Sequence, residues 1–141
     1  MRSSSPVLLI VDDHEDSLAM YAVGLLAMGF QPITAETAED AFLRACELRP
    51  DVVVADVVLP GGSGLDLSRR LRDDARTTGT RIIVLTGHSG GAVKQQAHDV
   101  GCDRFLLKAC LPDALACEIR DVLISREHAA TEASADRIAA A

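Results

Sequence analysis

The chain has 141 residues, 48% of them hydrophobic and 25% charged, with a formal net charge of −7. This composition is typical of one folded globular domain and excludes a chain that is disordered throughout. The acidic balance argues against direct binding of nucleic acid, which depends on clustered Lys and Arg.

Five short apolar runs alternate with longer helical patterns along the chain. The runs predict strands at residues 7–11, 30–35, 52–55, 81–85 and 103–107. Such alternation is typical of βαβ units and of a parallel sheet between helices. Four runs are almost continuously apolar, as expected for strands covered on both faces. The second run contains Pro32, which cannot donate to a strand ladder, so this strand is predicted at a sheet edge.

Apolar residues at helical spacing predict one buried stripe on each intervening helix. The stripe positions are Leu18, Ala22, Leu25 and Leu26, then Val93, Ala97 and Val100, and finally Leu115, Ile119, Val122 and Leu123. A third helix is expected at about residues 64–73. Helix boundaries are indicated by capping boxes, glycine stops and a first-turn proline. These signals are Thr37 with Asp40, Ser63 with Asp66, Gly29, Gly101 and Pro112.

The domain is predicted to span residues 1–125, followed by an Ala-rich tail, 126–141, that extends the last helix or is disordered. No apolar stretch approaches a membrane span or a secretion signal, so a cytoplasmic protein is expected. Cys46, Cys102, Cys110 and Cys117 lack zinc-site spacing and are predicted to be reduced and mostly buried. The basic run at 69–72 is interpreted as a solvated helix face.

Polar residues stand at the carboxyl ends of four of the five predicted strands. They are Asp12 and Asp13, Asp56, Thr86 and Lys108. An Asp, Thr or Lys at one strand end is most often a turn or surface residue. Parallel strands, however, bring their carboxyl ends to one rim of the sheet, where ligands of open α/β folds bind. The joint placement therefore predicts a functional site.

The residue types at this rim indicate a cation and phosphoryl chemistry. Carboxylates about 5 Å apart repel by roughly 3 kcal/mol per pair at an effective dielectric near 20. Mg²⁺ suits such an all-oxygen site because it accepts one or two carboxylates together with phosphate oxygens and water. A phosphoryl group on Asp56 would share its oxygens among the metal, the Lys108 ammonium and the Thr86 hydroxyl.

As a set, Asp12-Asp13, Asp56, Pro60 with Gly64, Thr86-Gly87 and Lys108 resemble the response-regulator receiver family of two-component signalling, over about residues 6–125. The resemblance implies a flavodoxin-like (βα)5 sandwich with a parallel sheet of order 2-1-3-4-5. It implies that Asp56 is the phosphoacceptor in a phosphorelay. It also implies that Mg²⁺ is held by Asp13, Asp56 and the Val58 carbonyl, with Asp12 acting through water.

The resemblance also assigns residues that respond to the phosphoryl group. Thr86 and Phe105 resemble the family's switch pair, with a plain core role of Phe105 as the less favoured alternative. Val58 and His88 occupy the positions that tune hydrolysis. Because Val58 cannot hydrogen-bond an attacking water, slow self-dephosphorylation is expected.

One position departs from the family pattern. Ala109 follows Lys108, where the family usually has proline in a cis peptide. A non-proline cis bond costs about 3 kcal/mol or more. A trans bond is therefore predicted, with a differently shaped loop after Lys108.

Other function classes fit the sequence less well. A haloacid dehalogenase-type enzyme needs a second acid where Val58 stands. The segment Asp12-x-His14-x-x-Ser17 partly matches the Asp-x-His-x-x-Gly loop of cobalamin-binding modules, but Ser17 stands where that loop has its final Gly. A flavin-binding module is disfavoured because four acidic residues near position 12 would repel the flavin phosphate. A phosphorylation-independent adaptor with the same fold stays open.

The favoured interpretation is a switch and not a conventional enzyme. Its predicted donor is a sensor histidine kinase or a histidine phosphotransfer protein. Output is expected through a protein partner at the fourth helix, fifth strand and fifth helix, without nucleic acid or membrane contact. No phosphate-accepting role is assigned to the histidines.

Overall fold

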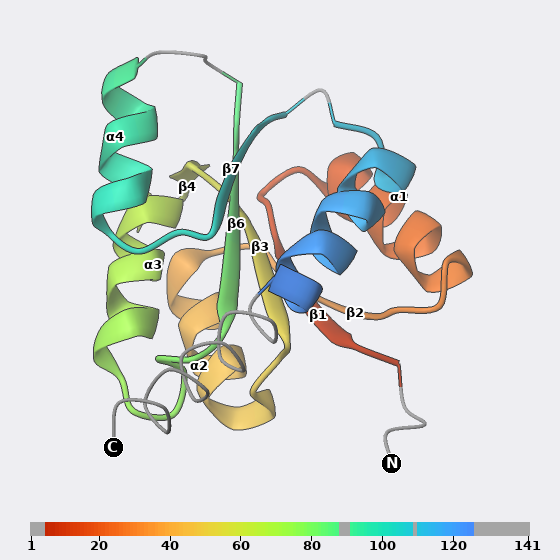
Figure 1. The fold of residues 1–141 in the computed structure, drawn as a ribbon, viewed down its shortest axis with the longest axis horizontal. Helices are drawn as coiled ribbons and strands as arrows, with labels where there is room; N and C mark the ends of the chain where they lie inside the picture. The colour runs from red at the N-terminus through yellow and green to blue at the C-terminus, as the bar shows by residue number, and fades with distance from the viewer. Residues whose placement is uncertain (1–4, 88–90, 109, 126–141) are drawn as a thin grey trace, which may run out of the picture.

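The computed structural model describes residues 5–87, 91–108 and 110–125. Five parallel strands form one sheet of order β2-β1-β3-β6-β7 (Figure 1). They are β1 Val7–Val11, β2 Gln31–Ala35, β3 Val52–Asp56, β6 Arg81–Thr86 and β7 Arg104–Leu107. The predicted order 2-1-3-4-5 is confirmed, and the strand with Pro32 lies at an edge as expected.

Helices cover both faces of this sheet. They are α1 Glu15–Ala27, α2 Ala38–Leu48, α3 Gly64–Asp73 and α4 Gly91–Asp99, and residues 112–125 are also helical. Helix α1 and the helix of 112–125 lie on one side of the sheet, whereas α2 and α3 lie on the other (Figure 1). The protein is therefore the predicted doubly wound α/β sandwich.

Two aliphatic cores result because successive strand residues point to opposite faces. In β1, for example, Leu8 and Ile10 pack against α1 and the helix of 112–125, while Leu9 and Val11 pack toward α2 and α3. Strands β1, β3 and β6 are buried along nearly their whole length. The polar residues of these three strands, Asp56, Arg81 and Thr86, consequently stand at strand ends.

The predicted helix boundaries are confirmed. The Thr37 hydroxyl accepts the Asp40 backbone N–H at 3.1 Å, and the Ser63 hydroxyl accepts that of Asp66 at 3.0 Å. Gly29 has a φ of +95° where α1 ends, a conformation that glycine adopts without steric cost. These local signals predicted the boundaries because capping depends on only a few neighbouring residues.

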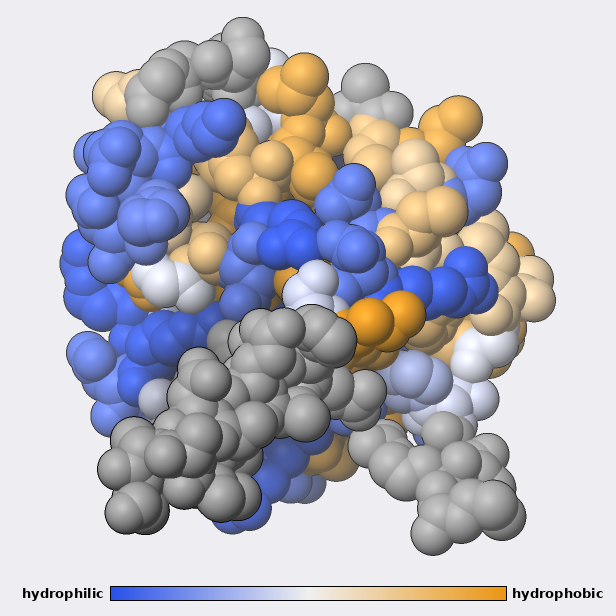
Figure 2. Space-filling model, viewed as in Figure 1, coloured by the Kyte–Doolittle hydropathy of each residue, from blue (hydrophilic) through white to orange (hydrophobic). Residues whose placement is uncertain are grey.

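Two burial predictions were wrong. Leu26 is 62% exposed, because the buried stripe of α1 runs through Leu18, Tyr21 and Leu25. All four cysteines are free, but only Cys46 is fully buried, and Cys117 is exposed on its helix. In Figure 2 the hydrophilic residues gather over α3 and α4, and apolar residues are more frequent on the side of α1.

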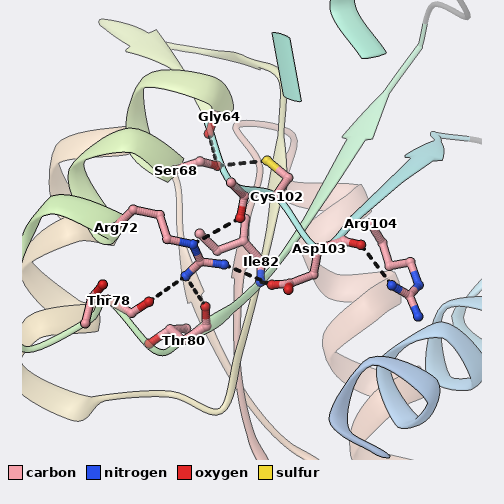
Figure 3. A network of polar contacts seen from close by, with 10 residues as sticks. Gly64, Ser68, Arg72, Thr78, Thr80, Ile82, Cys102, Asp103 and Arg104 are labelled. Carbon is pink, nitrogen blue, oxygen red and sulfur yellow. Dashed lines mark hydrogen bonds and ion pairs between the residues drawn. The ribbon is translucent and has the colours of Figure 1, made fainter. Parts of the chain in front are cut away.

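The interpretation of the run 69–72 as a solvated face was also wrong at Arg72. Its guanidinium donates to the carbonyls of Gly101 and Thr78 at 3.0 Å each and to the carbonyl of Thr80, and it pairs with Asp103 at 2.9 Å (Figure 3). Asp103 also accepts the Ile82 backbone N–H at 2.7 Å. Arg72 therefore ties the end of α3 to the beginnings of β6 and β7.

Three of the sequence predictions lie outside the described residues: the role of His88, the peptide bond to Ala109 and the tail of 126–141. Among the helices that are described, none combines the length and apolar character needed to cross a membrane.

Candidate functional site

The predicted site residues meet at the rim formed by the carboxyl ends of the strands. Asp12 follows β1 directly, Asp56 ends β3, Thr86 ends β6 and Lys108 follows β7. The adjacent strands hold them in place through the sheet ladder, and the Lys108 backbone N–H donates to the Thr86 carbonyl at 2.6 Å. The topology thus gathers residues that are up to 96 positions apart in the sequence, Asp12 and Lys108.

Lys108 is the central cation of the rim. Its ammonium lies 2.6 Å from the Asp56 carboxylate and 3.2 Å from that of Asp12. Both carboxylates are almost fully buried, with 6% and 3% of the residue exposed. Burial works against the lysine charge, but the hydrogen bonds that Lys108 donates to Asp56 and Asp12 outweigh this effect and raise the pKa of Lys108. Lys108 is therefore charged at neutral pH.

Asp12 is held as a carboxylate by its neighbours. Its burial favours protonation, but the backbone and imidazole N–H groups of His14 and the Lys108 ammonium outweigh that effect and lower its pKa. The His14 backbone N–H lies 3.0 Å from Asp12 Oδ1, and His14 Nδ1 lies 2.9 Å from the same oxygen.

The rim residues fit a divalent cation. Ligand atoms of Asp12, Asp13, His14 and Asp56 all lie within 4.8 Å of one another. Three carboxylates against one ammonium leave an excess of negative charge that a small cation would neutralise, and oxygen donors are those that Mg²⁺ prefers. The residues present therefore suit the cation expected from the sequence, with Asp12, Asp13 and Asp56 as its carboxylates.

His14 is a site residue that the sequence reasoning missed. Its Nδ1 lies 3.1 Å from Asp13 Oδ1 in addition to its contact with Asp12. The hydrogen bond to Asp12 and the charge of Asp13 raise the pKa of His14. In the sequence, His14 was compared with a cofactor-binding loop and was assigned no phosphate-accepting role. Its position next to two strand-end acids was the available signal.

The loop after Asp56 is fixed by a small hairpin. Strands β4 Val58–Leu59 and β5 Gly62–Ser63 pair in antiparallel fashion, and the Gly64 N–H donates to the Val57 carbonyl at 2.9 Å. A Cβ on Gly64 would collide with the backbone carbonyl of Asp56. Gly64, known at first only as part of the motif, is thus required by close backbone approach beside Asp56.

Two further predicted residues lie near the rim. The Val58 side chain is 70% exposed, and the ligand role of its carbonyl stays a prediction. Phe105 is half-buried in β7 and packs against the core on the α2 and α3 side of the sheet. A half-buried ring is compatible both with a core role and with a movement, so the structure leaves the switch role of Phe105 a prediction.

Comparisons of the sequence with known proteins point to one family. Residues 8–120 match the model of the response regulator receiver domain. The phosphate regulon transcriptional regulatory protein PhoB of Pseudomonas aeruginosa is 35% identical over 116 residues, which are 82% of this chain and 51% of that protein. The transcriptional regulatory protein KdpE of Mycobacterium tuberculosis is 33% identical over 126 residues, 89% of this chain and 54% of that protein. The chain thus spans about half the length of these relatives.

Solved structures agree. A putative response regulator from Chloroflexus aurantiacus superposes with a TM-score of 0.81 at 28% identity, covering 86% of this chain and 99% of that one. The chemotaxis response regulator CheY4 of Vibrio cholerae gives a TM-score of 0.80 at 27% identity, covering 84% and 99%. The similarity thus covers nearly the whole of each of these two solved chains.

Proposed function

The chain belongs to the response regulator receiver domain family, and from this premise we propose that Asp56 is the residue that accepts the phosphoryl group. As a member of this family it is a phosphorylation-controlled switch of two-component signalling. The observation that carries the proposal is the Asp56 carboxylate itself, buried at the rim, 2.6 Å from the Lys108 ammonium and close to Asp12 and Asp13.

The proposed reaction is a phosphoryl transfer to a carboxylate. An Asp56 oxygen forms a bond to phosphorus while the bond from phosphorus to the donor breaks, and the donor atom leaves with the electron pair. Mg²⁺, when bound by Asp12, Asp13 and Asp56, would supply positive charge to the phosphoryl oxygens. The protein thereby holds its reactive carboxylate close to the groups that stabilise the product.

Lys108 has two roles in this proposal. It neutralises Asp56 before transfer, and its ammonium is within reach of a phosphoryl oxygen afterwards. Asp12 holds the other side of the ammonium at 3.2 Å, so Lys108 stays at the rim when Asp56 becomes esterified. Thr86, at the end of the neighbouring strand, is proposed to donate its hydroxyl to the phosphoryl group and to signal with Phe105.

The lifetime of the signal is proposed to be long. Val58 presents only an aliphatic side chain to solvent beside Asp56. It therefore offers no hydrogen bond to a water that attacks the acyl phosphate. Val58→Asn is expected to accelerate loss of the phosphoryl group, and an unchanged rate would contradict the proposal.

The partners are proposed from the family. A sensor histidine kinase or histidine phosphotransfer protein would be the donor, and a protein partner would receive the signal. The absence of a conventional enzymatic activity, a cytoplasmic location and a domain boundary near residue 125 stay predictions.

The test is intact-mass spectrometry after incubation with acetyl phosphate, with and without Mg²⁺. Wild type is expected to gain one phosphoryl group only with Mg²⁺, and Asp56→Asn should gain none. Asp99→Asn, which changes an exposed helical aspartate bonded to Gln95, serves as the matched control and should behave as wild type. No gain in wild type with acetyl phosphate or with a histidine kinase would favour a phosphorylation-independent adaptor.

A further inference from the structure

Helix α1 connects the two halves of the rim. Asp12 and Asp13 precede it, separated from its first residue by His14, and Tyr21 lies within it. Tyr21 is only 1% exposed, and its hydroxyl donates to the Cys110 carbonyl at 2.7 Å. The same oxygen lies 3.5 Å from the Lys108 carbonyl. A side chain of the helix that follows the acidic pair therefore holds the backbone next to the lysine.

A second contact on the same helix supports this anchor. A Cβ on Gly24 would lie 2.6 Å from the Pro112 Cβ, so α1 and the segment entering the last helix approach as closely as glycine allows. Tyr21 and Gly24 are three positions apart and share one face of α1. Together they fix the chain at residues 110 and 112.

The other side of Lys108 is fixed by the sheet. Its backbone N–H donates to the Thr86 carbonyl at 2.6 Å, and the Cys110 N–H donates to the Leu107 carbonyl at 3.1 Å. The hydroxyl of Tyr21 is thus the side-chain donor that joins this turn to α1. Burial raises the pKa of the Tyr21 phenol, so the hydroxyl keeps its proton.

We propose that Tyr21 is a positioning residue for Lys108: its hydroxyl holds the backbone at Cys110, two positions after the lysine, so that the ammonium reaches Asp56 and Asp12 together. The proposal rests on the function proposed above for Lys108. A lysine has a flexible four-carbon stem, so its backbone must be held if a short pair of contacts is to persist. The proline that usually follows this lysine in the family is replaced here, and a tertiary hydrogen bond provides the restraint.

The first test compares phosphorylation rates. Tyr21→Phe removes only the hydroxyl and keeps the buried ring. We expect the initial rate with acetyl phosphate and saturating Mg²⁺ to fall about three- to tenfold, the range given by the loss of one buried hydrogen bond. Mg²⁺ affinity should stay unchanged, since Lys108 is not a proposed metal ligand. In a Lys108→Ala background, Tyr21→Phe should cause no further loss of rate.

Thr77→Val is the matched control. The Thr77 hydroxyl is equally buried, at 1% exposure, and donates to the Leu71 carbonyl at 2.7 Å, but it lies at the opposite rim. A comparable loss of stability without a loss of rate is expected in Thr77→Val. Equal losses of rate in the two variants would attribute the effect of Tyr21 to stability and overturn the proposal.

The second test needs no phosphorylation. The chain has two lysines, Lys94 and Lys108, so the Nζ signal of Lys108 can be assigned in a ¹⁵N NMR spectrum with a Lys108→Arg variant. We expect a signal from slowly exchanging ammonium protons in wild type, and its loss or broadening in Tyr21→Phe but not in Thr77→Val. If the Lys108 signal is present in wild type and lost in Tyr21→Phe, but wild type accepts no phosphate, the proposed function is refuted and the positioning role stays supported. An unchanged Lys108 signal in Tyr21→Phe would overturn the positioning role.

Discussion

Two half-buried cations at opposite rims of the sheet have contrasting surroundings. The side chain of Arg72, near the beginnings of β6 and β7, is 19% exposed, and that of Lys108, at the carboxyl ends, is 25% exposed. Arg72 meets one carboxylate, that of Asp103, and three backbone carbonyls. Lys108 meets two carboxylates, with the third, of Asp13, close by.

The difference separates a structural role from a functional one. Around Arg72 the guanidinium pairs with the Asp103 carboxylate, and the carbonyls are fixed parts of the backbone. Around Lys108 the carboxylates outnumber the ammonium, and their mutual repulsion destabilises the folded protein. A bound cation would relieve this repulsion. The same fold therefore has one rim that stabilises it and one that is prepared for ligands.

The largest effect is expected where the charges balance. Arg72→Met keeps an apolar stem but leaves the Asp103 carboxylate without this cation, and we expect a loss of about 3 kcal/mol in the free energy of unfolding. Urea unfolding followed by far-UV circular dichroism measures it. Arg69→Met, at a side chain 64% exposed, should change stability by less than about 0.5 kcal/mol. A loss below about 1 kcal/mol for Arg72→Met would contradict the structural role.

The functional rim has one rigid point, at Gly64. Gly64→Ala forces a methyl group against the Asp56 carbonyl, and a loss of stability of about 2 kcal/mol is expected from overpacking, together with slower phosphorylation. Gly79→Ala is the control, because a Cβ there has no heavy atom within 4 Å. Equal stabilities of the two variants would show that the backbone beside Asp56 accommodates the added methyl group, and would contradict the prediction.

Cation binding should stabilise the functional rim alone. At a Mg²⁺ concentration ten times its Kd, linkage predicts a gain of about 1.4 kcal/mol in the free energy of unfolding. In Asp13→Asn most of this gain should vanish, whereas Arg72→Met should retain it. Thermal unfolding at several Mg²⁺ concentrations, with EDTA as the reference, checks the prediction, and equal gains in wild type and Asp13→Asn would place the cation elsewhere.

The smallest expected effect has the opposite sign. Without Mg²⁺, Asp13→Asn removes one of three crowded carboxylates from a half-exposed position, and we expect stability to rise by about 0.5 kcal/mol. Asp103→Asn removes the carboxylate that pairs with Arg72 (Figure 3) and should lower stability. If both variants lose stability, the two rims do not differ in charge balance as proposed.

Much of the fold followed from local sequence patterns. Strand runs, capping residues and the edge position of Pro32 were predicted correctly, because each depends on periodicity or on the backbone chemistry of a few neighbours. The site residues Asp12, Asp56, Thr86 and Lys108 could also be named in advance. Parallel topology by itself brings strand ends to one rim.

The errors arose where a contact joins distant segments. Arg72 looked like one of several surface arginines, and nothing local shows that carbonyls of Thr78, Thr80 and Gly101 converge on it. Leu26 is as apolar as a core residue, but the packing of α1 on the sheet turns the stripe of Leu18, Tyr21 and Leu25 inward and leaves Leu26 outside it.

The order of the elements, the acidic rim and the family motifs follow from residue type and spacing alone. Which side chains hold that rim depends on tertiary packing. The bond from Tyr21 to Cys110 spans 89 positions, and the clash that fixes Gly64 involves a backbone carbonyl. Such contacts depend on how helices pack on the sheet, to within fractions of an ångström, and a pattern of residue types does not contain that distance.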